Sequence, residues 1–458
     1  MQTLSNSPFK AYDIRGRIPD SLNEQLAFRI GQAYAAVIQP NGPVAIGRDM
    51  RLSSPGLAIA VAEGLKQSGL DTVDIGLCGT ELVYHAASRP GMGGGIMVTA
   101  SHNPADYNGM KMVRELAIPI SADTGLKQIE DLLVREAEPA VADTSAGQTS
   151  SEDVYPGYVE RMLASIQIDR IKPLKVVVNA GNGCAGPAFD EIARALPLEV
   201  TRLHHEPDGR FPNGVPNPLL MENRTETAAA VRQAGADFGI AWDGDFDRCF
   251  FFDEDGRFIE GYYLVGLFAA RLLESHPGEK IVLDPRLTWN TLDQVQAAGG
   301  VALINKSGHA FIKERMRAEN ALYGGEMSAH HYFRDFSFCD SGMLPWLLLA
   351  EIISDTGRSL AELVNERIRA FPCSGELNFS VQDTDLVIAA VLDAYAGQNP
   401  SLDRTDGISL EFSDWRFNLR ASNTEPVIRL NVETRANEAL LSERTGQLSE
   451  MIQRFGQG

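Results

Sequence analysis

The apolar and polar residues of this chain follow one order that recurs three times. In each copy a short apolar run leads into a polar loop and then into a stretch whose apolar residues recur at helical spacing. Short apolar runs between turn residues are typical of buried strands, and apolar residues at every third or fourth position predict an amphipathic helix. The predicted strand and helix pairs are Val44–Gly47 with Leu57–Gln67, Lys175–Asn179 with Ala188–Leu196, and Lys280–Leu283 with Thr291–Ala298.

Each copy continues with a second predicted strand, a further helical stretch and a third strand that ends in a polar loop. Strands that alternate with helices predict α/β layers with mainly parallel sheets, whose ligand sites lie beyond the carboxyl ends of the strands. We therefore expect three related units whose polar loops face one cleft. The second strands are Thr72–Ile75, Leu198–Leu203 and Val301–Asn305, and the loops after the third strands contain Ser101, Asp243 and Glu326.

The pattern changes after residues 371–375, where short strand-like runs surround one helical stretch and a final helix closes the chain. This arrangement predicts a fourth, smaller α+β domain. Residues 138–152 are small, polar and rich in turn formers, and they are typical of a linker. The strand-like runs are Glu376–Val381, Gly407–Phe412, Trp415–Leu419 and Val427–Val432, and the helical stretch is Asp385–Tyr395.

Composition narrows the class of protein. With 458 residues the chain exceeds what one hydrophobic core usually supports, so several domains are expected. Its 41 basic and 61 acidic residues give a net charge of −20, which argues against nucleic acid or an anionic membrane as partner. The five cysteines are scattered and form no CxxC, which favours a reducing compartment. The first residues lack the apolar core of a signal peptide, and we expect a cytoplasmic protein.

Ser101 ends an apolar run and opens a loop of His, Asn, Pro, Asp, Tyr and Gly. A buried strand that delivers a serine to such a loop is a common way to present a nucleophile, although many serines at these places only cap helices. No GxSxG elbow surrounds Ser101, so acyl transfer by a catalytic triad is poorly supported. A serine that carries a phosphoryl group needs no triad, but it needs a cation to offset the charge.

Asp243, Asp245 and Asp247 occupy alternate positions after the strand-like run Phe238–Trp242. The alternative is an acidic surface turn, but three like charges so close together repel one another unless a cation lies among them. Oxygen ligands without His or Cys suit Mg²⁺ rather than Zn²⁺. Arg248 next to them is either an ion-pair partner of the carboxylates or a phosphate contact.

Two further loops carry groups suited to a phosphosugar, and each could also be an ordinary turn. Glu326, Ser328 and His330 offer a carboxylate acceptor and two neutral groups for sugar hydroxyls. The segment RASNTEP at 420–426 offers a guanidinium fork with hydroxyl and backbone donors, which suits a phosphate monoester. Tyr12 and Arg15, Lys111, and His309 are ordinary when taken singly. In an acidic protein, however, an anionic ligand requires cations that are concentrated at one site.

Four segments in this order, TASHNP, DGDFDR, GEMSAHH and RASNTEP, resemble the signature loops of the α-D-phosphohexomutase superfamily, and the opening KAYDIRG agrees. The sugar loop is similar to that of bacterial phosphomannomutases, including enzymes that act on both mannose and glucose phosphates. The resemblance implies a fold of three related α/β domains with mixed, mainly parallel sheets and a smaller C-terminal α+β domain around a central cleft. The implied domains are residues 1–145 with the phosphoserine, 146–255 with the metal, 256–369 for the sugar and 370–458 for the phosphate.

The resemblance also implies the roles of the site residues. Ser101 would carry the phosphoryl group, and one Mg²⁺ per chain would be held by that phosphate and the three aspartates. Arg15 and Lys111 would lie near the transferred group, and Lys111 and His330 are candidates for the acid and base. Residue 425, where the family often has a second threonine, is glutamate here. The implied substrate-binding residues are Tyr12, Arg248, His309, Glu326, Ser328, His330, Arg420, Ser422, Asn423 and Thr424.

The implied activity is the reversible conversion of mannose 6-phosphate to mannose 1-phosphate, which would feed nucleotide-sugar and polysaccharide synthesis. A hexose 1,6-bisphosphate would be both its intermediate and its activator. Equal action on glucose phosphates is one alternative, because no residue in the sequence identifies a partner for the 2-hydroxyl. A Mg²⁺-dependent sugar phosphatase is a second, and a phosphosugar-binding regulator without turnover is a third. As partner we expect a small-molecule phosphosugar, with neither nucleic acid nor a membrane, and we expect a monomer, with a dimer as the alternative.

Overall fold

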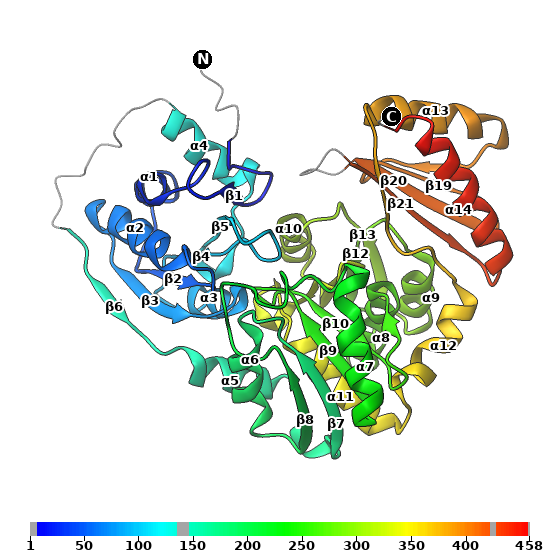
Figure 1. Ribbon diagram of the computed structural model, residues 1–458, viewed down its shortest axis with the longest axis horizontal. Coiled ribbons are helices and arrows are strands. Elements are labelled where there is room, and N and C mark those ends of the chain that lie inside the picture. The colour runs from blue at the N-terminus through cyan, green and yellow to red at the C-terminus, as the bar shows by residue number, and fades with distance from the viewer. Residues whose placement is uncertain (1–6, 135–145, 422–426, 457–458) are drawn as a thin grey trace. The chain divides into compact units, whose positions relative to one another are not determined.

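The computed structural model of the chain describes residues 7–134, 146–421 and 427–456 (Figure 1). The chain divides into two compact units, one formed by Met1–Phe258 with His330–Gly357 and the other by Ile259–Ala329 with Arg358–Gly458. Within the described ranges, no helix combines the length and the apolar character needed to span a membrane. The five cysteines are all free.

The first sheet has six strands in the order β1-β5-β4-β2-β3-β6. Its middle strand β2 pairs in parallel with both β3 and β4, whereas β5 pairs antiparallel with β4 and β1. The elements of this part are β1 (Ile14–Arg17), α1 (Glu24–Ile38), β2 (Val44–Arg48), α2 (Ser54–Gln67), β3 (Thr72–Leu77), α3 (Thr80–Ala87), β4 (Gly94–Val98), β5 (Tyr107–Arg114), α4 (Leu126–Val134) and β6 (Thr149–Ser151).

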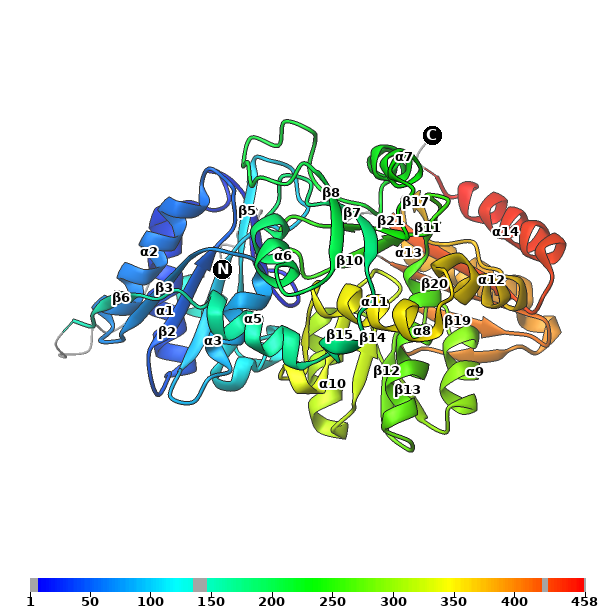
Figure 2. The same ribbon diagram turned by 90° about the horizontal axis from the view of Figure 1, so that it is seen from below.

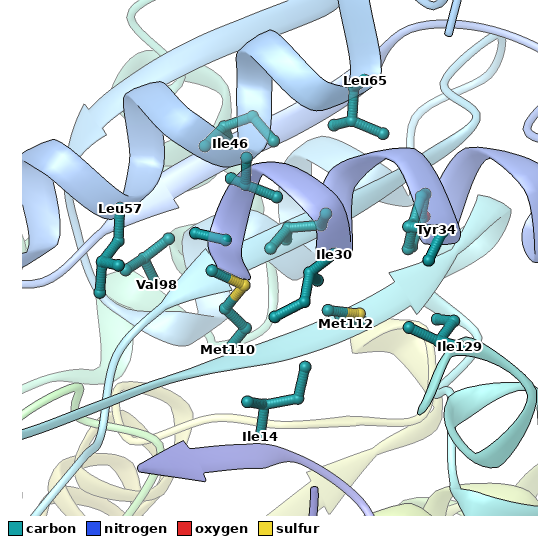
Figure 3. Packing of buried hydrophobic residues seen from close by; sticks show 14 of the residues in the cluster. Ile14, Ile30, Tyr34, Ile46, Leu57, Leu65, Val98, Met110, Met112 and Ile129 are labelled. Carbon is teal, nitrogen blue, oxygen red and sulfur yellow. The ribbon is translucent and has the colours of Figure 1, made fainter. Parts of the chain in front are cut away.

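The two faces of this sheet are covered in different ways because side chains alternate along a strand. Ile46 and Val98 point to one face and join the cluster of buried residues that α1, α2 and α4 complete (Figure 3). On the other face the strands have Gly47 and Gly95, and a Cβ at either position would clash with Val83 of α3. Glycine at these two positions therefore lets α3 approach the sheet closely, next to the strand that leads to Ser101.

The second sheet has the order β11-β10-β9-β7-β8, with β7 parallel to β8 and β9 and with β10 antiparallel to β9. Helices α6 and α7 lie on opposite faces of these strands (Figures 1 and 2). The elements are α5 (Tyr155–Ala164), β7 (Leu174–Asn179), α6 (Ala185–Ala193), β8 (Leu198–Leu203), α7 (Thr225–Ala234), β9 (Phe238–Trp242), β10 (Cys249–Phe252) and β11 (Phe258–Ile259).

Residues 330–357 complete the first unit with a hairpin and a helix. The hairpin is the antiparallel pair β15 (His331–Phe333) and β16 (Cys339–Asp340), and the helix is α11 (Leu344–Thr356). The indole nitrogen of Trp242, at the end of β9, donates to the carbonyl of Gly342 at 2.8 Å. The rings of Phe189 in α6 and Trp346 in α11 pack with their centres 5.0 Å apart. These contacts hold the end of β9, where the aspartate loop begins.

The second unit begins with a three-layer part whose strand β12 pairs in parallel with β13 and β14. Its C-terminal part is an antiparallel sheet in the order β17-β21-β20-β19-β18, with α13 and α14 packed on one face. The elements are α8 (Gly261–Ser275), β12 (Lys280–Leu283), α9 (Trp289–Ala297), β13 (Val301–Ile304), α10 (His309–Glu319), β14 (Tyr323–Gly325), α12 (Leu360–Ala370), β17 (Leu377–Ser380), α13 (Thr384–Tyr395), β18 (Ser401–Asp403), β19 (Ile408–Glu411), β20 (Trp415–Ala421), β21 (Val427–Thr434) and α14 (Glu438–Gln453).

The predicted threefold recurrence is confirmed. In each copy the first strand (β2, β7 or β12) lies between the second strand (β3, β8 or β13) and the third (β4, β9 or β14). The loops with Ser101, Asp243 and Glu326 follow the third strand in all three copies. The fold class of three α/β domains with mixed, mainly parallel sheets and a smaller C-terminal domain is therefore correct.

Some local predictions are wrong. Residues 149–151, which we assigned to a linker, form β6 and pair in parallel with β3; residues 138–145 of that segment lie outside the described residues. Helix α2 begins at Ser54 rather than at Leu57, because Pro55 stands in its first turn, where a missing N–H leaves no hydrogen bond unmade. For the same reason α6 begins at Ala185 although Gly186 and Pro187 follow.

Candidate active site

Ser101 lies three residues after the end of β4 and is 2% exposed. Its φ of +49° places it in the left-handed region, which a residue with a Cβ adopts at a cost of about 1 kcal/mol. The hydroxyl of Thr99 holds this conformation by accepting from the Ser101 N–H at 2.9 Å. The strand end and the bend together fix where the Ser101 hydroxyl points.

Arg51, in the loop after β2, supports the rest of the serine loop. Its guanidinium donates to four backbone carbonyls, those of Ser101, Asn103, Pro104 and Tyr107, at 2.6–2.9 Å. The Arg51 side chain is almost fully buried and also pairs with Asp49 at 3.3 Å. The carbonyl oxygens of a tight loop need donors, and one arginine supplies them here. Sequence reasoning had treated this loop only as a connection between strand and helix.

Asp243, Asp245 and Asp247 follow β9 directly and are almost completely buried. Their chain is bent by the hydrogen bond from the Phe246 N–H to the Asp243 carbonyl at 3.1 Å, with Phe246 at a φ of +44°. As a result, one carboxylate oxygen from each aspartate lies within 4.8 Å of the others. The bend therefore turns all three side chains inward, and they do not form a surface turn.

The two oxygens of each aspartate have different surroundings. Each Oδ2 accepts hydrogen bonds from the protein: Asp243 from Arg248, Asp245 from Lys111 at 2.7 Å, and Asp247 from Lys111. Each Oδ1 is buried without a hydrogen-bond partner among the described residues. Three clustered carboxylates that each have a buried, unpartnered oxygen match the hard oxygen ligands that Mg²⁺ requires. The donor set therefore fits this ion.

The serine and the aspartates, predicted from distant segments, form one site. The Ser101 hydroxyl donates to Asp243 Oδ2 at 2.6 Å and lies 2.9 Å from His102 Nδ1. Arg248 Nη2 donates to the same His102 nitrogen, so that nitrogen carries no proton. Burial and, to a smaller extent, the nearby Arg248 together lower the pKa of His102 to about 4. The imidazole is therefore neutral at pH 7. Sequence reasoning assigned no role to His102.

Lys111 and Arg248 are the cations of this cluster. Burial alone would lower the pKa of the Lys111 ammonium, but Asp245 and Asp247 reverse this effect and raise it above its ordinary value. The same balance holds for the aspartates, because burial would raise the pKa of Asp245 whereas Lys111 and Thr80 bring it below its ordinary value. All these groups are therefore charged at neutral pH.

The other predicted residues of the first unit surround this cluster. The Arg15 guanidinium donates to Asp13 at 2.7 Å and to the carbonyl of Ala100, next to Ser101, at 3.2 Å. Tyr12 lies in the turn before β1 and interacts electrostatically with Arg15. His330 Nε2 lies 3.7 Å from Asp247 Oδ1. The structure thus brings Arg15, Lys111, Arg248 and His330 to the serine and aspartate loops.

Thr80 is a further contributor that sequence reasoning missed. It starts α3, and its hydroxyl donates to Asp245 Oδ2 while its N–H donates to the Asp245 carbonyl at 3.0 Å. Gly79 precedes it, and a Cβ there would clash with the Phe246 ring. A buried Gly-Thr pair at a helix start was the available signal, but no local pattern identifies its distant partner.

In the second unit a pair after β12 organises the predicted sugar loop. Arg286 forms two hydrogen bonds with Asp284, at 2.8 and 2.9 Å, and donates to the Ser328 hydroxyl at 3.2 Å. Its Nη2 also lies 3.5 Å from Glu326, while Asp284 accepts from the Met327 N–H at 2.8 Å. Neither Asp284 nor Arg286 was singled out from the sequence, although both stand in a loop after a predicted strand.

His309 and Arg420 also belong to the second unit. His309 is the first residue of α10, and the preceding Gly308 N–H donates to Glu326 at 2.9 Å, which places the histidine beside the sugar loop. Arg420 lies near the end of β20, and its guanidinium donates to Glu376 at 3.1 Å. The remaining predicted phosphate ligands, Ser422, Asn423 and Thr424, lie outside the described residues.

Sequence models of one family match nearly the whole chain. The descriptions are phosphoglucomutase/phosphomannomutase, alpha/beta/alpha domain I at residues 6–140, domain II at 156–256 and domain III at 260–371, and the C-terminal domain at 376–449. The chain belongs to the phosphoglucomutase/phosphomannomutase family, and with it to the α-D-phosphohexomutase superfamily.

Individual relatives agree with this assignment. A protein of Xanthomonas campestris pv. campestris (strain B100) named phosphohexose mutases is 60% identical over 444 residues, which are 97% of this chain and 98% of that protein. A phosphomannomutase of Salmonella montevideo is 54% identical, with 97% of this chain and 98% of that protein covered. The crystal structure of a phosphoglucomutase/phosphomannomutase family protein from Burkholderia thailandensis superimposes with a TM-score of 0.87 at 34% identity, covering 99% of this chain and 98% of that chain.

Proposed function

We propose that this protein is a phosphomannomutase that interconverts mannose 6-phosphate and mannose 1-phosphate through a phosphorylated Ser101. The observation that carries the proposal is the 2.6 Å hydrogen bond from the Ser101 hydroxyl to Asp243, one of three buried carboxylates that each keep an unpartnered oxygen. A phosphoryl group on Ser101 would meet this cluster directly. The full-length likeness to relatives named phosphomannomutase supports mannose as the sugar.

The reaction consists of two phosphoryl transfers. In the first, the bond between phosphorus and Ser101 Oγ breaks while a bond forms to the free hydroxyl of the sugar phosphate, which loses its proton to a base. The product is a hexose 1,6-bisphosphate and a serine alkoxide that takes up a proton. The bisphosphate then turns end for end, and its other phosphoryl group returns to Ser101. Such transfers depend on in-line positioning and charge neutralisation more than on covalent help.

The residues around Ser101 suit this neutralisation. Mg²⁺, held by Asp243, Asp245, Asp247 and the phosphoserine, would stabilise the charge of the transferred group when bound. Arg15 reaches the backbone next to Ser101 and would contact phosphate oxygens there. The raised pKa of Lys111 keeps its ammonium protonated, which favours the role of cation or proton donor over that of base.

The residues of the second unit would hold the rest of the ligand. Glu326 and Ser328 would accept and donate hydrogen bonds to sugar hydroxyls, with His309 close by. Arg420, with the predicted Ser422, Asn423 and Thr424, would hold the phosphate that is not being transferred. Because the bisphosphate must bind in two orientations, the phosphate-binding group should contact phosphate only.

A second substrate class deserves equal testing. The Xanthomonas relative is named for hexoses in general, and glucose differs from mannose only at the 2-hydroxyl. A site without a buried partner for that hydroxyl discriminates weakly. The ratio of kcat/KM on mannose 1-phosphate and glucose 1-phosphate decides between a mannose-specific and a dual-specificity enzyme.

Intact mass spectrometry with peptide mapping tests the central assignment. After incubation with hexose 1,6-bisphosphate, the protein should gain one phosphate on the peptide that contains Ser101. Ser101→Ala should gain none and lose mutase activity, whereas Ser121→Ala, at another buried serine of the same domain, should behave as wild type. Release of inorganic phosphate without isomerisation would instead identify a phosphatase.

Metal titration tests the aspartate cluster independently of activity. Asp247→Asn removes one of the three converging charges, and Mg²⁺ affinity measured by calorimetry should fall by about tenfold or more, since a charged ligand contributes more than 1 kcal/mol. Asp255→Asn serves as control, because this residue lies in the turn between β10 and β11 and outside the cluster. Equal Mg²⁺ affinities of both variants would contradict the proposed metal site.

A further inference from the structure

Arg420 and Arg429 are directly opposite each other on the antiparallel strands β20 and β21. Like charges at such positions repel, and the repulsion grows when the side chains are shielded from water. Both guanidinium groups are largely buried, with side-chain exposures of 8% and 23%. A third one, that of Arg286, approaches from the loop after β12 and is 4% exposed. This cluster of three arginines needs an anion.

Glu376, the residue before β17, supplies that anion. One carboxylate oxygen accepts from Arg420 Nη2 at 3.1 Å and from Arg286 Nη1 at 3.4 Å. The other oxygen lies 3.4 Å from Arg429 Nη1. The partial burial of Glu376 by itself raises the pKa of its carboxyl, but the three guanidinium groups lower it below the ordinary value. The side chain is therefore a carboxylate at neutral pH and contacts all three arginines.

The three arginines depend on Glu376 to different degrees. Arg286 already has two hydrogen bonds to Asp284, at 2.8 and 2.9 Å, so its charge is balanced without Glu376. Arg420 has no such second carboxylate at hydrogen-bond distance among the described residues, and its buried Nε has no hydrogen-bond partner there. A ligand anion that displaced Glu376 from Arg420 could use both the released Nη2 and this Nε, as a bidentate phosphate contact does.

We propose that Glu376 is an internal counter-anion that occupies Arg420 in the absence of ligand and is displaced by the phosphate of the sugar. The inference rests on the proposed function, in which Arg420 holds the phosphate that is not being transferred. Glu376 is then a positioning residue that sets the strength of phosphate binding. It weakens binding by competition, and it returns to Arg420 whenever the phosphate leaves.

This competition suits a ligand whose phosphate must dissociate from Arg420 during the reaction. A phosphate on Arg420 that met no competing anion would leave slowly, and the bisphosphate has to turn before the second transfer. With Glu376 present, Arg420 exchanges one anion for another, and its charge stays balanced when the phosphate leaves. Loss of the carboxylate should therefore tighten phosphate binding and lower KM, while kcat falls because release of the ligand is slower.

The test is calorimetric titration of the full chain with inorganic phosphate. Glu376→Gln should bind phosphate about tenfold tighter than wild type, the change expected when one competing charged hydrogen bond is lost. Glu443→Gln is the matched control, because it removes one negative charge from α14, where the side chain is 54% exposed. Equal or weaker phosphate binding by Glu376→Gln than by this control would overturn the inference.

Two further variants keep the result interpretable. Glu376→Asp retracts the carboxylate and should give an intermediate phosphate affinity, so it replaces the glutamine variant if that protein does not fold. In Glu376→Gln/Arg420→Ala the gain should disappear, since it depends on Arg420. If Arg420→Ala alone leaves phosphate binding and KM unchanged, the proposed phosphate site fails. If Arg420→Ala weakens phosphate binding but Glu376→Gln does not strengthen it, the phosphate site stands and only the proposed counter-anion role of Glu376 is overturned.

Discussion

Buried carboxylates in this protein differ in what balances their charge. Asp243, Asp245 and Asp247 have Lys111 or Arg248 within hydrogen-bond distance, and they remain ionised. Glu81, in the first turn of α3, is fully buried and accepts a hydrogen bond from the Tyr158 hydroxyl instead. Burial raises the pKa of Glu81 to about 8, and Asp340 and Asp247 also act in this direction. A neutral hydroxyl donor compensates for burial less than a cation does.

The raised pKa of Glu81 predicts a pH-dependent stability. Between pH 4.5, the ordinary pKa of a glutamate, and about pH 8, Glu81 holds a proton in the folded protein that it has lost in the unfolded chain. The stabilisation by this proton is therefore complete below pH 4.5 and is lost as the pH rises through 8. Glu81→Gln removes the titration. The melting temperature of this variant relative to wild type, measured in EDTA, should therefore be higher at pH 9 than at pH 5. Glu160→Gln, an exposed residue of α5, should show the same difference at both pH values; a pH-independent effect of Glu81→Gln would contradict the argument.

At this scale, the sequence predicts residues whose pattern is local and misses those whose partners are remote. The aspartates could be found because three charges at alternate positions already imply a cation. Thr80 and Arg51 could not, because their partners Asp245 and Ser101 are contributed by other elements. His102 stood next to Ser101, but a histidine has no role until the hydrogen bonds at its ring nitrogens are known.

Among the secondary-structure elements, α1 and α2 show how a close contact depends on glycine. A Cβ at Gly64 of α2 would overlap the carbonyl of Phe28 in α1, and a Cβ at Gly31 of α1 would overlap the carbonyl of Val61 in α2. The two helices therefore meet backbone to backbone. This pair covers the face of the first sheet that carries Ile46 and Val98 (Figure 3).

Two glycine-to-alanine substitutions within helices should have opposite effects. Gly446→Ala, on the exposed side of α14 with open space around it, should stabilise the protein by about 0.5–1 kcal/mol, because alanine favours the helix. Gly64→Ala gains the same propensity but forces α1 and α2 apart, and it should destabilise by about 1–3 kcal/mol. Denaturant unfolding measures both. Stabilisation by both variants would show that helix propensity dominates over packing, and destabilisation by Gly446→Ala would contradict the propensity argument.

The types and order of the elements could be predicted because apolar periodicity reflects burial. Their ends could not always be predicted, since Pro55 and Gly186 look like loop residues and yet stand in the first turns of α2 and α6. The strand at 149–151 was missed because an exposed edge strand has no apolar pattern to show, and only its hydrogen bonds to β3 define it.

On the scale of the whole molecule, the second unit is held together by a buried ion pair. Glu433 of β21 is fully buried, pairs with Arg416 of β20 at 2.7 Å, and accepts from the Thr288 N–H at the start of α9 at 2.7 Å. Arg416 also donates to the carbonyls of Pro285 and Arg286, at 2.9 and 3.2 Å. The C-terminal sheet thus fixes the backbone of Arg286, whose side chain contacts Ser328 and Glu326.

Neutralising Glu433 should destabilise the second unit strongly. Glu433→Gln leaves Arg416 charged and buried, and the cost of an uncompensated buried charge is about 3–5 kcal/mol. Glu411→Gln removes the other carboxylate near the same arginine, 3.8 Å away and 45% exposed, and should cost less than about 1 kcal/mol. In scanning calorimetry the melting temperature should fall clearly in Glu433→Gln and change little in Glu411→Gln. Similar shifts in both variants would contradict the role of burial.

The threefold recurrence could be predicted from the sequence because each copy repeats the same order of elements, and the structure gives the three copies the same strand order. The ion pair of Glu433 and Arg416 could not be foreseen, since both residues occur at strand positions that suit exposed charges equally well. Long-range pairing of charges is set by tertiary packing, which single-sequence patterns do not contain.

The backbone at residue 101 has an evolutionary consequence. Glycine adopts a φ of +49° more readily than a residue with a Cβ does, but glycine lacks the hydroxyl. Selection for backbone conformation alone would favour glycine at this position, and under the proposed function selection for turnover keeps the serine. A descendant released from its metabolic task should therefore lose the serine early, while Arg51 and the surrounding loop outlast it.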